Sequence, residues 1–163
     1  MNKENTYTST GSKYARNFEM IKSLRNGIGH PNSLQISLTN KCNLNCVFCS
    51  VSKRDKSIEW NYGELVNALS KFENIGVKTV ELTGSGEPTL YEKFIPLVWV
   101  IKRLGLKIGM ITNGIKLKDI PEPVLNQFDW IRVSLTSLDY VEDIEIPSFK
   151  GTLGFSYIVG QKV

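Results

Sequence analysis

Short apolar runs alternate with helical patterns from about residue 33 onward, and this alternation limits the possible folds more than any other feature of the chain. Five runs rich in β-forming residues and bounded by Gly, Asn and Pro predict strands at 34–38, 77–82, 106–111, 130–135 and 153–159. Their nearly continuous apolarity indicates strands that are covered on both faces. Strand, helix and strand in repetition predict an α/β fold with right-handed βαβ units and a parallel sheet.

The first crossover carries the clearest helical pattern. Leu65, Leu69 and Phe72 recur at helical spacing, Asn61 is a candidate N-cap, and Gly76 follows the last apolar position. The sequence therefore predicts one helix between the first two strands.

The later crossovers become progressively shorter. A capping-box pattern at Thr89 and Glu92 predicts a second helix whose apolar face runs from residue 94 to 104. Residues 121–128 allow only two helical turns, with Asp119 as a candidate cap, and residues 136–152 lack helical periodicity and contain Pro147. We expect a short third helix and an extended loop before the fifth strand.

At 163 residues and 18.4 kDa the chain fits one domain. We expect a polar tail and a short helix in residues 1–33, with the tail over 1–12 and the helix over 14–25, and the core in residues 34–163. The fifth predicted strand ends four residues before Val163, so we expect a core that is shortened at its C-terminus. A partner chain, a dimer contact, or a sequence that originally continued further would then cover the open edge of the sheet.

Composition excludes some classes of function. Hydrophobic content of 41% and charged content of 22% are ordinary for a soluble domain, and no apolar stretch approaches the roughly 20 residues of a membrane span. The net charge of +4 is mild and its cations are scattered, which argues against nucleic-acid binding. The first 12 residues lack a secretory apolar core, so we expect a reducing, cytoplasmic location.

All three cysteines of the chain lie in one loop after the first predicted strand. Cys42, Cys46 and Cys49 have the spacing C-x3-C-x2-C, and Asn residues suited to tight turns lie between them. A four-iron cluster normally takes four thiolates, so three would leave one iron without a protein ligand. The spacing favours an iron–sulfur cluster with a position open for chemistry.

Three thiols in one loop can also arise without such a cluster. They could be buried small hydrophobes, a zinc site, or a disulfide with one spare thiol. Core cysteines do not gather in a polar loop, and zinc needs a fourth ligand, for which His30 is the only histidine. His30 precedes Pro31 and is expected to be a turn residue.

The cysteine spacing, with Phe48 directly before the last cysteine, resembles the signature of the radical S-adenosylmethionine (SAM) superfamily. Further segments resemble the family's motifs in the expected order, over about residues 34–160. These segments are Leu82-Thr83-Gly84-Ser85-Gly86-Glu87-Pro88, Ile111-Thr112-Asn113-Gly114, Arg132-Val133-Ser134-Leu135 and, most loosely, residues 154–160. The resemblance implies a partial parallel βα barrel, similar to a TIM barrel, with about five strands where the family commonly has six.

The resemblance also implies the cofactors and the chemistry. Cys42, Cys46 and Cys49 would hold a [4Fe-4S] cluster, and SAM would bind the open iron. Reductive cleavage of SAM would give methionine and a 5′-deoxyadenosyl radical that removes hydrogen from an unidentified substrate. An electron donor such as flavodoxin or ferredoxin would reduce the cluster. The absence of further cysteines argues against auxiliary clusters within this chain.

The family's SAM-binding roles can be placed on matching residues. Glycine at 84 and 86 lets the backbone approach a ligand closely, and Glu87 is expected to accept from the amino group of SAM. Arg132, on the same strand face as Ser134, would pair with the carboxylate of SAM or of Glu87. Our candidate cofactor-binding residues are Phe48, Gly84, Ser85, Gly86, Glu87, Thr112, Asn113 and Ser134. No separate catalytic residue stands out.

Each of these positions also fits an ordinary structural role. The segment 84–88 could be a plain strand-to-helix turn, Phe48 a core residue, and Asn113-Gly114 a tight turn. Three other functions remain open for the whole chain: a shortened, non-catalytic module that binds the cluster or SAM and acts through a partner, a small electron-transfer protein, and a zinc-stabilised binding domain.

Overall fold

A computed structural model describes residues 18–29 and 31–159 of the chain. The expected tail over residues 1–12, the turn at His30 and the last motif residue, Gly160, lie outside these described residues. The division of the chain at residues 33 and 34 into two parts remains a prediction. None of the helices in the described ranges is long and apolar enough to cross a bilayer.

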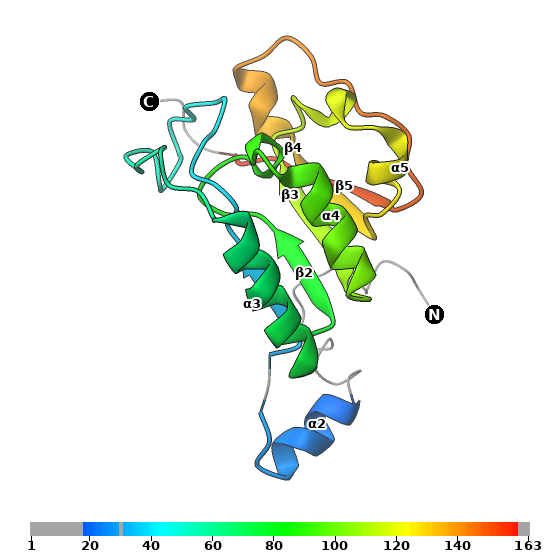
Figure 1. Cartoon of the computed structure of the whole chain (residues 1–163). Coiled ribbons are helices and arrows are strands. Elements are labelled where there is room, and N and C mark those ends of the chain that lie inside the picture. The colour runs from blue at the N-terminus through cyan, green and yellow to red at the C-terminus, as the bar shows by residue number, and fades with distance from the viewer. Residues whose placement is uncertain (1–17, 30, 160–163) are drawn as a thin grey trace.

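Five parallel strands form one sheet in the order β1-β2-β3-β4-β5, which confirms the predicted α/β architecture. The strands are β1 Ser33–Ile36, β2 Thr79–Leu82, β3 Lys107–Thr112, β4 Trp130–Ser134 and β5 Thr152–Ser156. Sequential order with parallel pairing is what repeated right-handed βαβ units produce. In the described part of the chain β1 and β5 are the two edges, so the sheet is an open, partial barrel (Figure 1).

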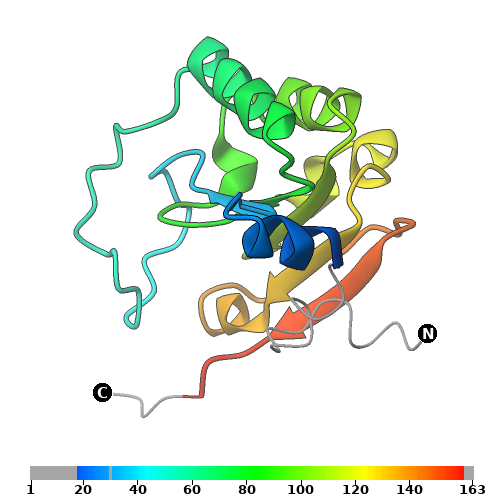
Figure 2. The ribbon, with the colours of Figure 1, turned by 90° about the horizontal axis from the view of Figure 1, so that it is seen from below.

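Helices connect these strands or precede them. The described α-helices are α2 Phe18–Arg25, α3 Tyr62–Asn74, α4 Phe94–Arg103 and α5 Glu122–Leu125. The described 3-10 helices are η2 Pro88–Leu90, η3 Leu117–Asp119 and η4 Leu135–Asp139. Helix α2 covers the later part of the short N-terminal helix that the sequence predicts. Figure 2 shows α3, α4 and α5 in a row along one face of the curved sheet.

The first crossover helix begins and ends as predicted. The Asn61 side chain accepts a hydrogen bond from the backbone N–H of Glu64 at 3.1 Å, and Leu65 and Leu69 point into the core. Gly76 follows the helix with φ of +102°, a conformation that glycine adopts without the steric cost of a Cβ.

Two predicted caps are wrong. Thr89 lies in η2, which Glu87 caps, and α4 begins at Phe94 after Lys93 without a side-chain cap. Glu87 rather than Thr89 acts as the cap, because the Glu87 carboxylate accepts hydrogen bonds from both the N–H and the hydroxyl of Thr89. Asp119 is likewise part of η3, and Pro121 precedes α5.

The core lies between the sheet and the row of helices. Side chains of alternate strand positions, including Val80, Ile108 and Ile131, pack there against Leu97 and Ile101 of α4. The other strand positions face the opposite, concave side, where Gln35 donates to Glu81 at 2.8 Å. The sheet therefore separates an apolar layer from a polar inner face.

Candidate functional site

The cysteine loop, which we define as residues 37–61, connects β1 to α3 at the carboxyl ends of the strands (Figure 1, cyan to teal). An antiparallel bridge between Thr39 and Glu59 closes its base. Asn40 N–H donates to the Ile58 carbonyl at 2.9 Å, and Trp60 N–H donates to the Leu38 carbonyl at 3.0 Å. Both ends of the loop are thus fixed beside β1.

The loop packs directly against the turn after β2. Glu87 N–H donates to the Lys41 carbonyl at 2.8 Å. A Cβ at Gly86 would lie 2.3 Å from the carbonyl oxygens of both Thr39 and Lys41, so no side chain fits at this position. The cysteine loop itself makes the close contact at residue 86, and the approach to a ligand that the sequence predicts there stays a prediction.

The glycine at position 84 has both a conformational and a steric role. Its φ is +127°, and a Cβ would lie 2.4 Å from the Cβ of Ser37. The next residue, Ser85, donates its N–H to the Ser37 hydroxyl at 2.9 Å. These contacts lock the turn after β2 against the end of β1.

Two further contacts hold the middle of the loop. The Asn113 amide donates to the Asn43 side-chain oxygen at 2.7 Å, which joins the loop to the end of β3. The Tyr140 hydroxyl accepts from Val47 N–H at 2.9 Å and joins the loop to the segment after β4. No sequence pattern signals these roles of Tyr140 and Asn43, because the contacts join residues 93 and 70 positions apart.

The three thiols of Cys42, Cys46 and Cys49 are free and partly exposed. The pKa of the Cys46 thiol is raised, first by burial and then by the neighbouring Cys42 and Cys49. In residues 18–29 and 31–159, no three Cys, His, Asp or Glu side chains converge closely enough to hold a single metal ion. The structure places the three predicted ligands in one loop as free thiols, and three thiols are a donor set that suits an iron–sulfur cluster.

The Glu87 carboxylate is buried against its own chain. Oε1 accepts from the Thr112 hydroxyl at 2.6 Å and from the hydroxyl of Thr89 at 2.8 Å, and Oε2 accepts from Asn113 N–H at 2.8 Å. Burial raises the pKa of this carboxyl, while the donated hydrogen bonds act in the opposite direction. The suggested pairing of Glu87 with Arg132 is wrong, because Arg132 is exposed on the concave face of β4.

The remaining candidates lie around the loop. Phe48 is 42% exposed beside the last cysteine. The Ser134 hydroxyl, 3.4 Å from that of Thr136, lies at the end of β4. The hydroxyl of Thr112 is enclosed, since it donates to Glu87 and accepts from Gly114 N–H at 3.0 Å. Of these three side chains, Phe48 and Ser134 are accessible and Thr112 is buried.

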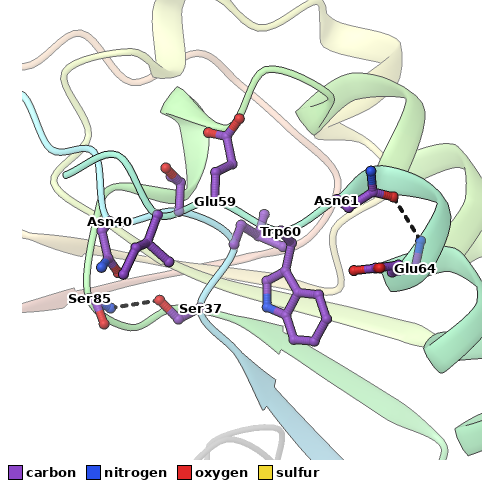
Figure 3. A pocket seen from close by; sticks show the side chains of 10 residues that line it. Ser37, Asn40, Glu59, Trp60, Asn61, Glu64 and Ser85 are labelled. Atoms are coloured by element: carbon purple, nitrogen blue, oxygen red, sulfur yellow. Dashed lines mark hydrogen bonds between the residues drawn. The ribbon is translucent and has the colours of Figure 1, made fainter. Parts of the chain in front are cut away.

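A pocket of about 310 Å³ opens between the base of the loop and the start of α3 (Figure 3). Its lining includes Ser37, Asn40, Trp60, Asn61, Glu64 and Ser85. The Ser85–Ser37 hydrogen bond forms part of its wall, so the pocket adjoins the turn at residues 84–86. Apart from Ser85, the sequence singled out none of these residues for binding.

Comparison with known proteins places this arrangement in a family. The family model for the radical SAM superfamily matches residues 36–146. An "S-adenosylmethionine-dependent nucleotide dehydratase" of a Thermoplasmatales archaeon is 30% identical over 123 residues, which cover 73% of this chain and 43% of that protein. A "Probable GTP 3',8-cyclase" of Thermococcus kodakarensis is 34% identical over 113 residues, covering 65% of this chain and 35% of that protein.

A solved structure has a similar fold. Streptococcus suis SuiB, bound to the precursor peptide SuiA, matches with a TM-score of 0.61 and 25% identity over 78% of this chain and 29% of SuiB. The chain thus spans less than half the length of each of these three relatives. The residues that the family model matches, 36–146, contain the cysteine loop and strands β2, β3 and β4.

Proposed function

The chain belongs to the radical SAM superfamily, whose cofactors are a [4Fe-4S] cluster and SAM, and on this premise we propose that it generates a radical from SAM and abstracts hydrogen from a small substrate. When bound, the reduced cluster supplies the electron that cleaves SAM to methionine and a 5′-deoxyadenosyl radical. The protein supplies the ligands, the orientation of SAM and the exclusion of side reactions.

One observation carries this proposal: three free thiols lie in a single loop that is tied to the ends of three neighbouring strands. Lys41, Asn43 and Val47 of the loop bond to Glu87, Asn113 and Tyr140 respectively. Such contacts fix the cysteine loop relative to the polar inner face of the sheet. The loop would therefore hold a cluster near the face of the sheet that the helices leave open in the described part of the chain.

We assign the thiolates of Cys42, Cys46 and Cys49 to the cluster. The partly exposed backbone at Ser85, between two glycines that bring it close to the loop, is suited to bind the polar methionine end of SAM. Phe48 offers an apolar ring to the adenine, and Ser134 a hydroxyl to the ribose or the substrate.

Glu87 and Thr112 act indirectly in this proposal. Glu87 accepts from the hydroxyl of Thr112 and the N–H of Asn113, so it holds the end of β3 against the turn after β2. Asn113 in turn uses its side-chain amide to hold the cysteine loop. We therefore propose Glu87 and Thr112 as positioning residues and Asn113 as the residue that transmits their effect to the loop.

A nucleotide is the first substrate class to test. The dehydratase and the cyclase named above act on nucleotides by their names, and each is similar to this chain over more than 100 residues. Exposed Arg132 on the concave face is suited to an anionic group such as a phosphate. A peptide is the competing class, because SuiB binds one.

The test is anaerobic. The full chain is reconstituted with iron and sulfide, reduced with dithionite and incubated with SAM, and 5′-deoxyadenosine is measured by liquid chromatography. We expect its release, faster in the presence of a nucleoside triphosphate than of an unrelated peptide. A matched Cys46→Ala protein should release none. No release from a fully loaded protein, with or without candidate substrates, would contradict radical chemistry.

A second candidate function is a non-catalytic module that binds the cluster or SAM and acts through a partner. The edge strand β5 supports it, because this strand leaves Phe155 52% and Leu153 38% exposed. A partner or a second copy would cover that edge. The same assay separates the candidates, because the module would bind SAM without releasing 5′-deoxyadenosine.

The physiological reductant and location follow from the same proposal. We propose a one-electron donor of the flavodoxin or ferredoxin class, acting in the cytoplasm, where free thiols and a reduced cluster persist.

A further inference from the structure

Arg54, five residues after the last cysteine, contacts the sulfur of that cysteine. Its Nη1 donates to Cys49 Sγ at 3.3 Å. Among the described residues, no other side chain donates a hydrogen bond to a cysteine sulfur. None of the sequence motifs extends to position 54, so the sequence alone assigns no role to Arg54.

Two backbone carbonyls hold the guanidinium in place. Arg54 Nε donates to the Asn40 carbonyl at 2.8 Å, and Nη1 also donates to the Val51 carbonyl at 2.8 Å. Asn40 is itself fixed, since its side chain donates to the Asp55 carbonyl at 2.8 Å. The partly buried Arg54 is therefore oriented toward the sulfur rather than free in solvent, and its charge is permanent.

The other cations of the loop differ from Arg54. Lys41 forms an ion pair with Glu59 at 3.2 Å, which offsets its charge. Lys53, the neighbour of Arg54, is exposed and makes no described hydrogen bond or ion pair. A charge-assisted hydrogen bond is roughly twice as strong as a neutral one, whereas an exposed charge is screened by water and salt.

We propose that Arg54 is a positioning residue that raises the reduction potential of the cluster through Cys49, an inference that depends on the proposed function. Reduction transfers one electron from a low-potential donor to the cluster and adds one negative charge to it. A cation that donates to a ligand sulfur stabilises the more negative state more strongly. Arg54 thereby makes the reduced cluster easier to form.

The experiment is a redox titration of the reconstituted full chain with dithionite and mediators, followed by the electron paramagnetic resonance (EPR) signal of the reduced cluster. Arg54→Gln should lower the ratio of reduced to oxidised cluster about tenfold at a fixed potential, which is about 59 mV for one electron. Arg54→Lys keeps the charge but loses the fork geometry, so it should shift the midpoint in the same direction by less.

Two matched controls separate this effect from simpler causes. Lys53→Gln removes one positive charge at the next position without touching a thiol. Tyr140→Phe removes a side-chain tie of the same loop, the hydroxyl that accepts from Val47 N–H, without changing charge. Both should leave the midpoint near that of the unaltered protein, although Tyr140→Phe should release iron faster.

The outcomes are distinct. An unchanged midpoint in Arg54→Gln, or an equal shift in Lys53→Gln or Tyr140→Phe, overturns the role of Arg54. Should Arg54→Gln fail to load a cluster, a midpoint of Arg54→Lys equal to that of the unaltered protein overturns it instead. Absence of iron and sulfide from the unaltered protein would defeat the proposed function itself, and this is measured before the titration.

Discussion

The helix-covered layer of the sheet and the cysteine loop lie next to each other but are held by different forces. Leu97, Ile101 and Met110 in the layer are completely buried, so the removal of apolar area from water stabilises it. The loop has regular pairing only at the bridge between Thr39 and Glu59, and side-chain and backbone hydrogen bonds hold the rest. The fold and the site should therefore respond separately to mutation.

Removal of a core side chain should have the largest effect on stability. Leu97→Ala leaves a cavity under the sheet at a position that is 0% exposed, and we expect a loss of about 2–5 kcal/mol in the free energy of unfolding. Urea titration of the cluster-free protein measures it. The fraction that remains folded should still load iron, since the loop contacts are intact. A loss of unfolding free energy below about 1 kcal/mol would contradict the claim that buried apolar side chains stabilise the helix-covered layer.

A methyl group at the junction of the two regions should disturb the site more than the fold. Gly86→Ala places a Cβ against the carbonyls of Thr39 and Lys41, and we expect about 1–3 kcal/mol of destabilisation with weaker SAM binding. Gly154→Ala is the control, because a Cβ there meets nothing within 4 Å. Both variants are loaded with the cluster and titrated with SAM in a calorimeter. Equal affinities for SAM would contradict the role of Gly86 at the site.

Loss of the Glu87 charge should have a comparable or smaller effect. In Glu87→Gln an amide N–H₂ replaces an oxygen that accepts from a donor, and a mismatched buried group costs about 1–3 kcal/mol. Glu92→Gln changes an exposed carboxylate and should leave the free energy of unfolding close to that of the unaltered protein. Equal unfolding free energies for Glu87→Gln and Glu92→Gln would contradict the role of Glu87 in holding the end of β3 against the turn after β2.

The difference in unfolding free energy between the unaltered protein and Glu87→Gln should also depend on pH, which gives a sharper test. Burial raises the folded-state pKa of Glu87 above the ordinary value of 4.5. Its contribution to stability is then fully present below the ordinary value and is lost as pH rises through the raised folded value. The glutamine variant lacks this titration, so its deficit should grow as pH falls. A deficit that shrinks in the same range would contradict the raised pKa.

The smallest effect is expected from a single tie of the loop. Tyr140→Phe removes the hydroxyl that accepts from Val47 N–H, a loss of about 0.5–1.5 kcal/mol that should appear as faster iron release. Tyr157→Phe is the control, since that hydroxyl faces Asp139 and does not contact the loop. Absorbance decay in the presence of a chelator measures both rates, and identical rates would exclude the tie.

Much of the layer was predictable because local patterns determine it. The spacing of Leu65 and Leu69, the cap at Asn61 and the glycine at position 76 predict α3 almost to its ends. The predicted helix cap at Thr89 is wrong because of a tertiary contact. Glu87 accepts a hydrogen bond from the Thr89 hydroxyl and also from that of Thr112, which is distant in the sequence.

The loop was predictable in composition but not in geometry. The spacing of the three cysteines was enough to identify the family, because that pattern is local, while the ligand set stays a prediction. The contacts of Tyr140 and Asn43 depend on how separate strand ends meet, and that of Arg54 depends on how the loop folds back on itself; none of the sequence motifs encodes them. The same meeting of strand ends buries Glu87 as an acceptor of its own chain, which the sequence did not predict; its predicted contact with the amino group of SAM stays a prediction.

The most direct test of the central claim is the EPR spectrum of the dithionite-reduced protein, recorded with and without SAM alongside iron and sulfide analysis. The account predicts about four irons and four sulfides per chain and a spectrum that changes when SAM occupies the iron that Cys42, Cys46 and Cys49 leave open. A loaded cluster whose spectrum does not respond to SAM, or a protein that takes up no iron, would contradict it.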